Sequence, residues 1–215
     1  MSSIEKENTY TSTNTYSTLN TLGPKTKNVW IVFHGIGYLS RYFINFFDTL
    51  SADENYIIAP QAPSKYYLKN QYKHVGASWL TKEKTELEIE NVLNSIDSVC
   101  EKEGIPNSLN LIVFGFSQGV SIAARWVAKR KIKCSQLVFY AGGLPNELKP
   151  TDFNFLQENN TEVKVIIGDK DEYLTADRML TENKRIDILF KGKAQTIKFE
   201  GGHEVKKEIV LSLIQ

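Results

Sequence analysis

The sequence predicts an α/β fold in which a mostly parallel sheet is covered by helices on both faces. Short, continuously apolar segments bounded by turn residues are typical of strands that are buried on both faces. These segments alternate along the chain with longer segments of helical period, which is the pattern of a parallel sheet. The chain has 215 residues, of which 41% are hydrophobic, enough for one core. We therefore expect a single domain over residues 1–215.

The composition excludes several classes of protein. The 26 Lys and Arg against 25 Asp and Glu leave a net charge of +1, which gives no reason to expect nucleic acid as a partner. Only Cys100 and Cys134 are present, so neither a disulfide framework nor a cysteine zinc site is indicated. No run approaches 18 apolar residues and no apolar signal core begins the chain, so we expect no membrane span and a cytoplasmic location. The oligomeric state stays open.

The N-terminal segment has an unusual composition. Residues 8–21 are almost entirely Thr, Ser, Asn and Tyr, and Thr and Tyr favour pleated backbone. Gly23-Pro24 then supplies a turn before the next predicted strand. Residues 1–27 are therefore predicted to form an edge strand or hairpin, with a low-complexity tail as the alternative.

The remaining elements are predicted from their hydrophobic periods. The predicted strands cover residues 29–33, 56–59, 109–114, 137–140, 163–167 and 196–199. The predicted helices cover residues 39–50, 81–103, 118–131, 175–190 and 204–213. Thr81 is the expected N-cap of the longest helix, and residues 66–80 have no clean period and are expected to form a loop. Functional residues should lie beyond the carboxyl ends of the strands.

A serine between glycines follows the third of these buried strands. Gly115-Phe116-Ser117-Gln118-Gly119 matches the pattern G-x-S-x-G between a strand and a helix, which is the context that this motif requires. The flanking glycines permit a tight turn with a strained serine backbone. The helix that begins at Gln118 directs its free amides toward a developing oxyanion. The motif therefore predicts Ser117 as a nucleophile.

A nucleophilic serine needs a base, and the chain has three histidines. His203, in Gly201-Gly202-His203-Glu204 after the last strand, fits the chain order of serine, acid and histidine found with this motif. His34 begins His34-Gly35-Ile36-Gly37, which resembles a loop that supplies an oxyanion amide. His74 lies in the aperiodic loop and is expected to be solvated. These positions predict His203 as the base.

Three acids compete to orient that base, because the strand over residues 163–167 runs into an acidic segment, Gly168 to Leu174. Asp171 is preferred because it is far enough past the strand to reach back over the sheet edge. Asp169 is expected to cap the turn, and Glu172 remains a third candidate. A calcium loop counted from Asp169 would need a glutamate where Leu180 stands, so we predict no metal and no other cofactor.

With these motifs the chain resembles an α/β-hydrolase, and is similar to the small carboxylesterase/phospholipase group that includes acyl-protein thioesterases. The resemblance covers residues 28–213 and implies the α/β-hydrolase fold without a large lid domain. It implies that Ser117, Asp171 and His203 are nucleophile, orienting acid and base. It also implies an oxyanion hole formed by the backbone amides of Ile36 and Gln118. The family's usual Asp-Pro segment is replaced here by Asp171-Glu172-Tyr173.

The predicted function is therefore a serine hydrolase that cleaves a small carboxylic ester or thioester. Tyr38, Leu39 and Trp79 are candidates to line the substrate pocket. Residues 61–80 are the one loop that could cover it, and whether they act as a lid stays open. The alternative is a non-catalytic binding or scaffold protein that keeps the fold, because a fold does not fix a function.

Overall fold

A seven-stranded sheet forms the centre of the molecule in a computed structural model that describes residues 3–173 and 176–214. The strand order is β1-β3-β2-β6-β7-β8-β9, and every neighbouring pair is parallel except β1 with β3. The mostly parallel sheet expected from the apolar segments is thus confirmed. The strands are β1 (Tyr16–Leu19), β2 (Asn28–Phe33), β3 (Asn55–Pro60), β6 (Asn110–Phe116), β7 (Gln136–Tyr140), β8 (Glu162–Gly168) and β9 (Gln195–Phe199).

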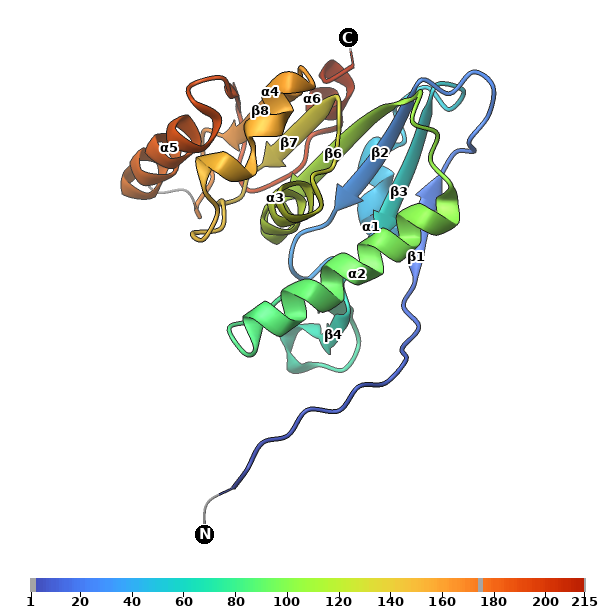
Figure 1. The fold of residues 1–215 in the computed structure, drawn as a ribbon, viewed down its shortest axis with the longest axis vertical. Helices are drawn as coiled ribbons and strands as arrows, with labels where there is room; N and C mark the ends of the chain where they lie inside the picture. Colours follow the sequence, from blue (N-terminus) through green and yellow to red (C-terminus); the bar gives the residue numbers. More distant parts are fainter. Residues whose placement is uncertain (1–2, 174–175, 215) are drawn as a thin grey trace.

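Helices cover both faces of this sheet (Figure 1). Successive residues of β2 point to opposite faces, so that Ile31 packs in one core and Trp30 in the other. The first core is covered by α2 (Thr85–Glu103), α3 (Gln118–Arg130), α4 (Asn154–Glu158) and α5 (Ala176–Phe190). The second core is covered by α1 (Ser40–Phe43), the 3-10 helix η1 (Ile44–Phe47) and α6 (Lys207–Ser212). A further 3-10 turn, η3 (Pro150–Asp152), precedes α4.

Two helix predictions differ from the structure in extent. Residues 39–50 form the short α1 and then the 3-10 turn η1, because apolar residues at helical spacing fit a tight turn as well as a long helix. The helix expected from Thr81 begins at Thr85, with Lys84 in a left-handed conformation (φ 47°) before it. Thr81 lies outside α2, where its hydroxyl accepts a hydrogen bond from the amide of Glu83 at 3.1 Å.

The segment expected to be a loop contains a hairpin. β4 (Ser64–Tyr67) and β5 (Val75–Ser78) pair in antiparallel fashion, with the 3-10 turn η2 (Leu68–Asn70) between them. All four residues of β4 are exposed, so neither face of that strand is marked by apolar side chains. A strand without hydrophobic alternation gives no periodic signal, and for this reason the prediction of a loop was wrong.

Within residues 1–27, the structure places β1 at the edge of the sheet against β3. Two tyrosines tie this edge to the end of α2, because the hydroxyls of Tyr16 and Tyr56 both donate to the carboxylate of Glu103.

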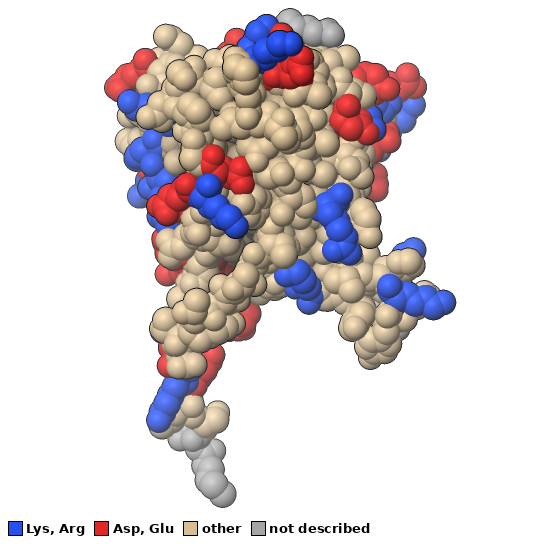
Figure 2. Space-filling model, turned by 90° about the vertical axis from the view of Figure 1, so that its right-hand side faces the viewer, with Lys and Arg blue, Asp and Glu red and all other residues tan. Residues whose placement is uncertain are grey.

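The face of the molecule shown in Figure 2 is mostly uncharged, and its acidic and basic side chains lie in small groups rather than in one continuous patch. Among the described residues, none of the helices has the length and apolar character needed to cross a bilayer.

Candidate active site

Ser117 lies at the sharp turn between β6 and α3 and has a strained backbone. Its φ of 53° and ψ of −117° are outside the regions that non-glycine residues normally adopt. The Ser117 amide is held by the carbonyl of Tyr140 at 2.9 Å. Two residues on, Gly119 lies so close to β2 that an added Cβ would be 2.1 Å from the Phe33 carbonyl oxygen. Only glycine permits this contact, which fixes the start of α3 at the carboxyl end of the sheet.

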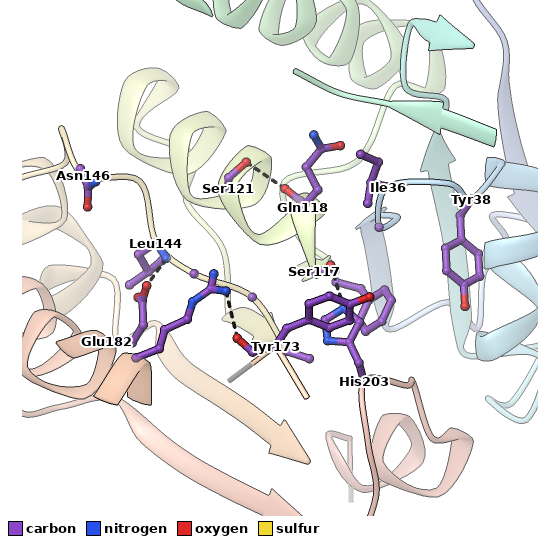
Figure 3. Close-up of a pocket in the computed structure, with 16 residues that line it drawn as sticks. Ile36, Tyr38, Ser117, Gln118, Ser121, Leu144, Asn146, Tyr173, Glu182 and His203 are labelled. Carbon is purple, nitrogen blue, oxygen red and sulfur yellow. Dashed lines mark hydrogen bonds between the residues drawn. The ribbon is translucent and has the colours of Figure 1, made fainter. Parts of the chain in front are cut away.

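Three side chains from the ends of β6, β8 and β9 form a continuous hydrogen-bonded chain. His203 Nε2 lies 2.9 Å from Ser117 Oγ, and His203 Nδ1 lies 2.8 Å from Asp171 Oδ2. In the tautomer that Asp171 favours, Nδ1–H donates a hydrogen bond to the carboxylate, and Nε2 accepts a hydrogen bond from the Ser117 hydroxyl. Figure 3 shows Ser117 and His203 pointing toward one another at the pocket. The predicted serine, acid and histidine are thus brought together.

The His203 ring is held by aromatic neighbours. Its centroid lies 5.1 Å from that of Phe116 and 4.7 Å from that of Tyr173. The Asp171 side chain is fully buried, and its second oxygen accepts a hydrogen bond from the Tyr173 amide at 2.9 Å. The carboxylate therefore has partners for both oxygens, and the imidazole has one well-defined orientation between two rings.

Asp171, and neither of the other two acids of the segment, is hydrogen-bonded to His203. Asp169 is exposed, and its side chain accepts a hydrogen bond from the Gly201 amide at 2.9 Å, so it caps the turn that leads to His203. Glu172 is also exposed. Leu174, the last residue of the predicted acidic segment, lies outside the described residues.

A pocket of about 590 Å³ opens beside Ser117. Tyr38 lines it, as expected, but Leu39 and Trp79 do not. Leu39 is buried in the core under α2 and α3. Trp79 is buried as well, and its ring nitrogen donates to the His34 carbonyl at 2.8 Å. The prediction that Leu39 and Trp79 form pocket walls was therefore wrong, because both side chains pack inward.

Ile36 and Gln118 flank Ser117 from two different elements, and both line the pocket. Within residues 3–173 and 176–214, no protein group accepts a hydrogen bond from the backbone amide of either residue. Gln118 is the first residue of α3, where the amides have no intrahelical partner. Two free N–H groups beside a hydroxyl are what an oxyanion requires.

The other two histidines are not part of this chain of hydrogen bonds. His34 has no exposed surface, its Nδ1 lies 2.8 Å from the Gly35 carbonyl, and its Nε2 lies 3.2 Å from the Ala62 amide nitrogen. Burial lowers the pKa of His34 from 6.5 to about 4, so the ring is neutral near neutral pH. His74 is exposed on the β4–β5 hairpin. Burial also raises the thiol pKa of Cys100 and Cys134 to about 12.

Sequence reasoning missed the wall of the pocket that faces α5. This wall consists of a Gly142-Gly143 turn after β7 together with polar side chains, namely Asn146, Arg178 and Glu182. Glu182 accepts a hydrogen bond from the Leu144 amide at 3.3 Å, and Arg178 donates to the Tyr173 carbonyl at 3.0 Å. The paired glycines after a predicted strand were the available signal.

The β4–β5 hairpin lies beside the pocket rather than across it. None of its described residues lines the pocket, and β5 is hydrogen-bonded to the loop after β2. The sequence left open whether residues 61–80 cover the site, and in this structure the hairpin leaves the pocket uncovered. Among the described residues, no cluster of three or more His, Cys, Asp or Glu side chains is arranged to hold a metal ion.

Comparisons with known proteins agree with this arrangement. The sequence model of the phospholipase/carboxylesterase family matches residues 15–215. No curated protein matches the chain in sequence.

Solved structures with the same fold include acyl-protein thioesterase 2 from Zea mays, with a TM-score of 0.71, 14% identity, and coverage of 94% of this chain and 98% of that one. A phospholipase/carboxylesterase from Dyadobacter fermentans has a TM-score of 0.61 at 21% identity, with 96% of each chain covered. Esterase PE8 has a TM-score of 0.66 at 18% identity, with 94% of this chain and 98% of that one covered. The chain therefore belongs to the phospholipase/carboxylesterase family of α/β-hydrolases.

Proposed function

We propose that the protein is a serine hydrolase that cleaves a carboxylic ester or thioester through an acyl-enzyme on Ser117. The observation that carries this proposal is the hydrogen-bonded chain from Asp171 through His203 to Ser117, with the serine lining a pocket. An activated nucleophile needs a base within hydrogen-bonding reach and a third group that orients the base.

The proposed reaction has two halves. Ser117 Oγ attacks the acyl carbonyl carbon while His203 Nε2 takes its proton, and the amides of Ile36 and Gln118 donate to the resulting oxyanion. His203 then gives the proton to the departing alcohol or thiol, which leaves the acyl group on Ser117. Water, deprotonated by His203, attacks the same carbon, the bond from that carbon to Ser117 Oγ breaks as His203 returns the proton to Oγ, and the acid is released. Asp171 holds the Nδ1–H tautomer and stabilises the imidazolium in both halves.

The chemistry of the pocket favours a short or medium acyl group. Ester and thioester present the same carbonyl to Ser117, so the hydrogen-bonded chain suits both. The wall formed by Asn146, Arg178 and Glu182 is polar, and a long apolar chain extending toward it would be buried against charged side chains. The proposed substrate is therefore a small-molecule ester or thioester.

A fluorophosphonate probe tests the proposal, because it reacts only with an activated serine. Wild-type protein should be labelled at Ser117, and Ser117→Ala should lose both the label and the turnover of short 4-nitrophenyl esters. Ser121 is the matched control: it also lines the pocket, but its hydroxyl donates to the Gln118 carbonyl at 2.8 Å, so Ser121→Ala should keep the label. Equal labelling of wild type and Ser117→Ala would refute the nucleophile. Inactivity of the wild type on all esters and thioesters would favour a non-catalytic scaffold.

A further inference from the structure

Residues 76–80 contact both of the elements that carry the free amides beside Ser117. We call this segment, the end of β5 with the two residues after it, the brace. Four of its five residues are buried, although it belongs to a hairpin whose other strand is exposed. It contacts the loop after β2 on one side and the first residue of α3 on the other, and its Ala77 and Trp79 side chains pack in the core.

The contact with the β2 loop is made by backbone hydrogen bonds, besides the Trp79 ring nitrogen that donates to the His34 carbonyl. The Gly37 amide donates to the Ala77 carbonyl at 2.9 Å, and the Ala77 amide donates to the Tyr38 carbonyl at 3.2 Å. An added Cβ on Gly76 would lie 2.5 Å from the Gly37 carbonyl oxygen, so the two backbones are as close as glycine allows. Ile36 immediately precedes this hydrogen-bonded stretch. The position of its amide therefore depends on the position of the brace.

The contact with α3 is made by the side chain of Gln118. Its Oε1 accepts from the Trp79 amide at 2.8 Å, and its Nε2 donates to the Leu80 carbonyl at 2.8 Å and to Ser78 Oγ at 3.0 Å. The side-chain amide thus satisfies the backbone of the brace as a neighbouring strand would. Figure 3 shows this side chain extending away from Ser117 and His203.

We infer that the Gln118 side chain is a positioning residue, which through the brace sets the separation between the amides of Ile36 and Gln118. This inference rests on the proposed function, because it concerns the oxyanion hole of that reaction. A backbone amide can be supplied by any residue at position 118, so the hole alone does not explain a glutamine. The brace does explain it: a side-chain amide with both a donor and an acceptor ties α3 to the segment that holds the Ile36 loop.

The expected consequence is a selective loss of transition-state stabilisation. Oxyanion donors act at fixed distances from a charge that exists only in the transition state, so a shift of the hole lowers kcat while ground-state binding is retained. Deleting one donor costs about 10²–10³-fold in kcat in a serine protease. Because the donors here are displaced and not deleted, we expect a fall of about 10- to 100-fold in kcat for Gln118→Ala.

The experiment measures kcat and KM with a short 4-nitrophenyl ester for wild type, Gln118→Ala and Gln118→Met. Methionine fills the same volume without hydrogen bonds, so it separates the brace from a packing defect. Both variants should lose kcat, with KM within about threefold of wild type. Gln136→Ala is the matched control, since Gln136 also donates its side-chain amide to a backbone carbonyl (Leu213, 2.9 Å) and lies away from the pocket. It should keep the wild-type kcat.

Ser78→Ala and hydrogen exchange complete the test. Ser78→Ala should lower kcat in the wild-type background. It should lower kcat little further in the Gln118→Ala background, because both substitutions act through the brace. The Gly37 and Ala77 amides should exchange at least about tenfold faster in Gln118→Met than in wild type. An unchanged kcat in Gln118→Met, or unchanged exchange at these two amides, would overturn the inference. The hydrogen-exchange measurement needs no turnover. It therefore tests the role of the Gln118 side chain in holding the brace even if the protein has no hydrolase activity.

Discussion

We expect the stability of the protein to depend on pH through the buried imidazole of His34. The ring has no exposed surface, and its Nε2 faces two donors, the amide of Ala62 at 3.2 Å and the side-chain nitrogen of Gln61 at 3.3 Å. A proton on Nε2 would point at both donors and would also place a charge in the core. Burial is the main cause that lowers the pKa from 6.5 to about 4.

The direction of the effect follows from proton linkage. Because the folded-state pKa is below the unfolded value, the unfolded chain binds more protons between pH 4 and 6.5. The contribution of His34 to stability is complete above pH 6.5 and is lost as the pH falls toward 4. A shift from 6.5 to about 4 corresponds to about 3 kcal/mol at 1.36 kcal/mol per unit, most of it already lost at pH 4.5.

The assay is urea unfolding followed by tryptophan fluorescence at pH 7.5 and pH 4.5. Wild type should lose about 2–3 kcal/mol more unfolding free energy between these two pH values than His34→Gln, whose side chain does not titrate. His74→Gln removes an exposed histidine from the hairpin and should follow the wild type. If His34→Gln and wild type lost the same free energy within about 0.5 kcal/mol, the argument from burial would be refuted.

Three further predictions concern the site. Asp171→Asn should lower kcat by several orders of magnitude, through loss of the tautomer and of imidazolium stabilisation, as in serine proteases where the same change costs about 10⁴-fold. Asp169→Asn should cost less than about tenfold, since among the described residues that side chain accepts only from the Gly201 amide, and the opposite ranking in steady-state kinetics would move the acid to Asp169. Gly119→Ala should destabilise the fold by about 3 kcal/mol, because its Cβ would lie 2.1 Å from a backbone oxygen, whereas Gly23→Ala meets nothing within 4 Å and should be neutral in urea unfolding. For 4-nitrophenyl esters, kcat/KM should rise through short chains and fall before palmitoyl, and a rise that continued to palmitoyl would contradict the polar wall.

The sequence predicted the sheet and the hydrogen-bonded chain because both depend on local signals. Continuous apolar runs mark buried strands, and in a parallel sheet their carboxyl ends meet at one edge, so residues that follow different strands are brought together. Ser117, Asp171 and His203 are separated along the chain and each follows a strand. Their meeting at 2.8–2.9 Å required only the topology and the right residue types.

The pocket walls were not predictable in the same way. Trp79 and Leu39 were expected at the pocket because large apolar residues near a motif suit both a pocket and a core. Which of the two applies depends on packing between distant segments, here the contact of Trp79 with the His34 carbonyl. The wall from α5 was missed because Arg178 and Glu182 lie on a helix that sequence periodicity places correctly but does not orient toward β7.

The buried histidine and the brace contact the same loop, which carries Ile36. Trp79, part of the brace, donates to the His34 carbonyl and packs its ring 4.9 Å from the imidazole. The His34 ring in turn is hydrogen-bonded to the carbonyl of Gly35, the residue directly before Ile36. The neutral His34 ring therefore contacts the loop at Gly35, and the brace contacts it at Gly37 and Tyr38. In the proposed reaction neither group touches the substrate, and we expect both to determine the position of the Ile36 amide relative to the acyl oxygen.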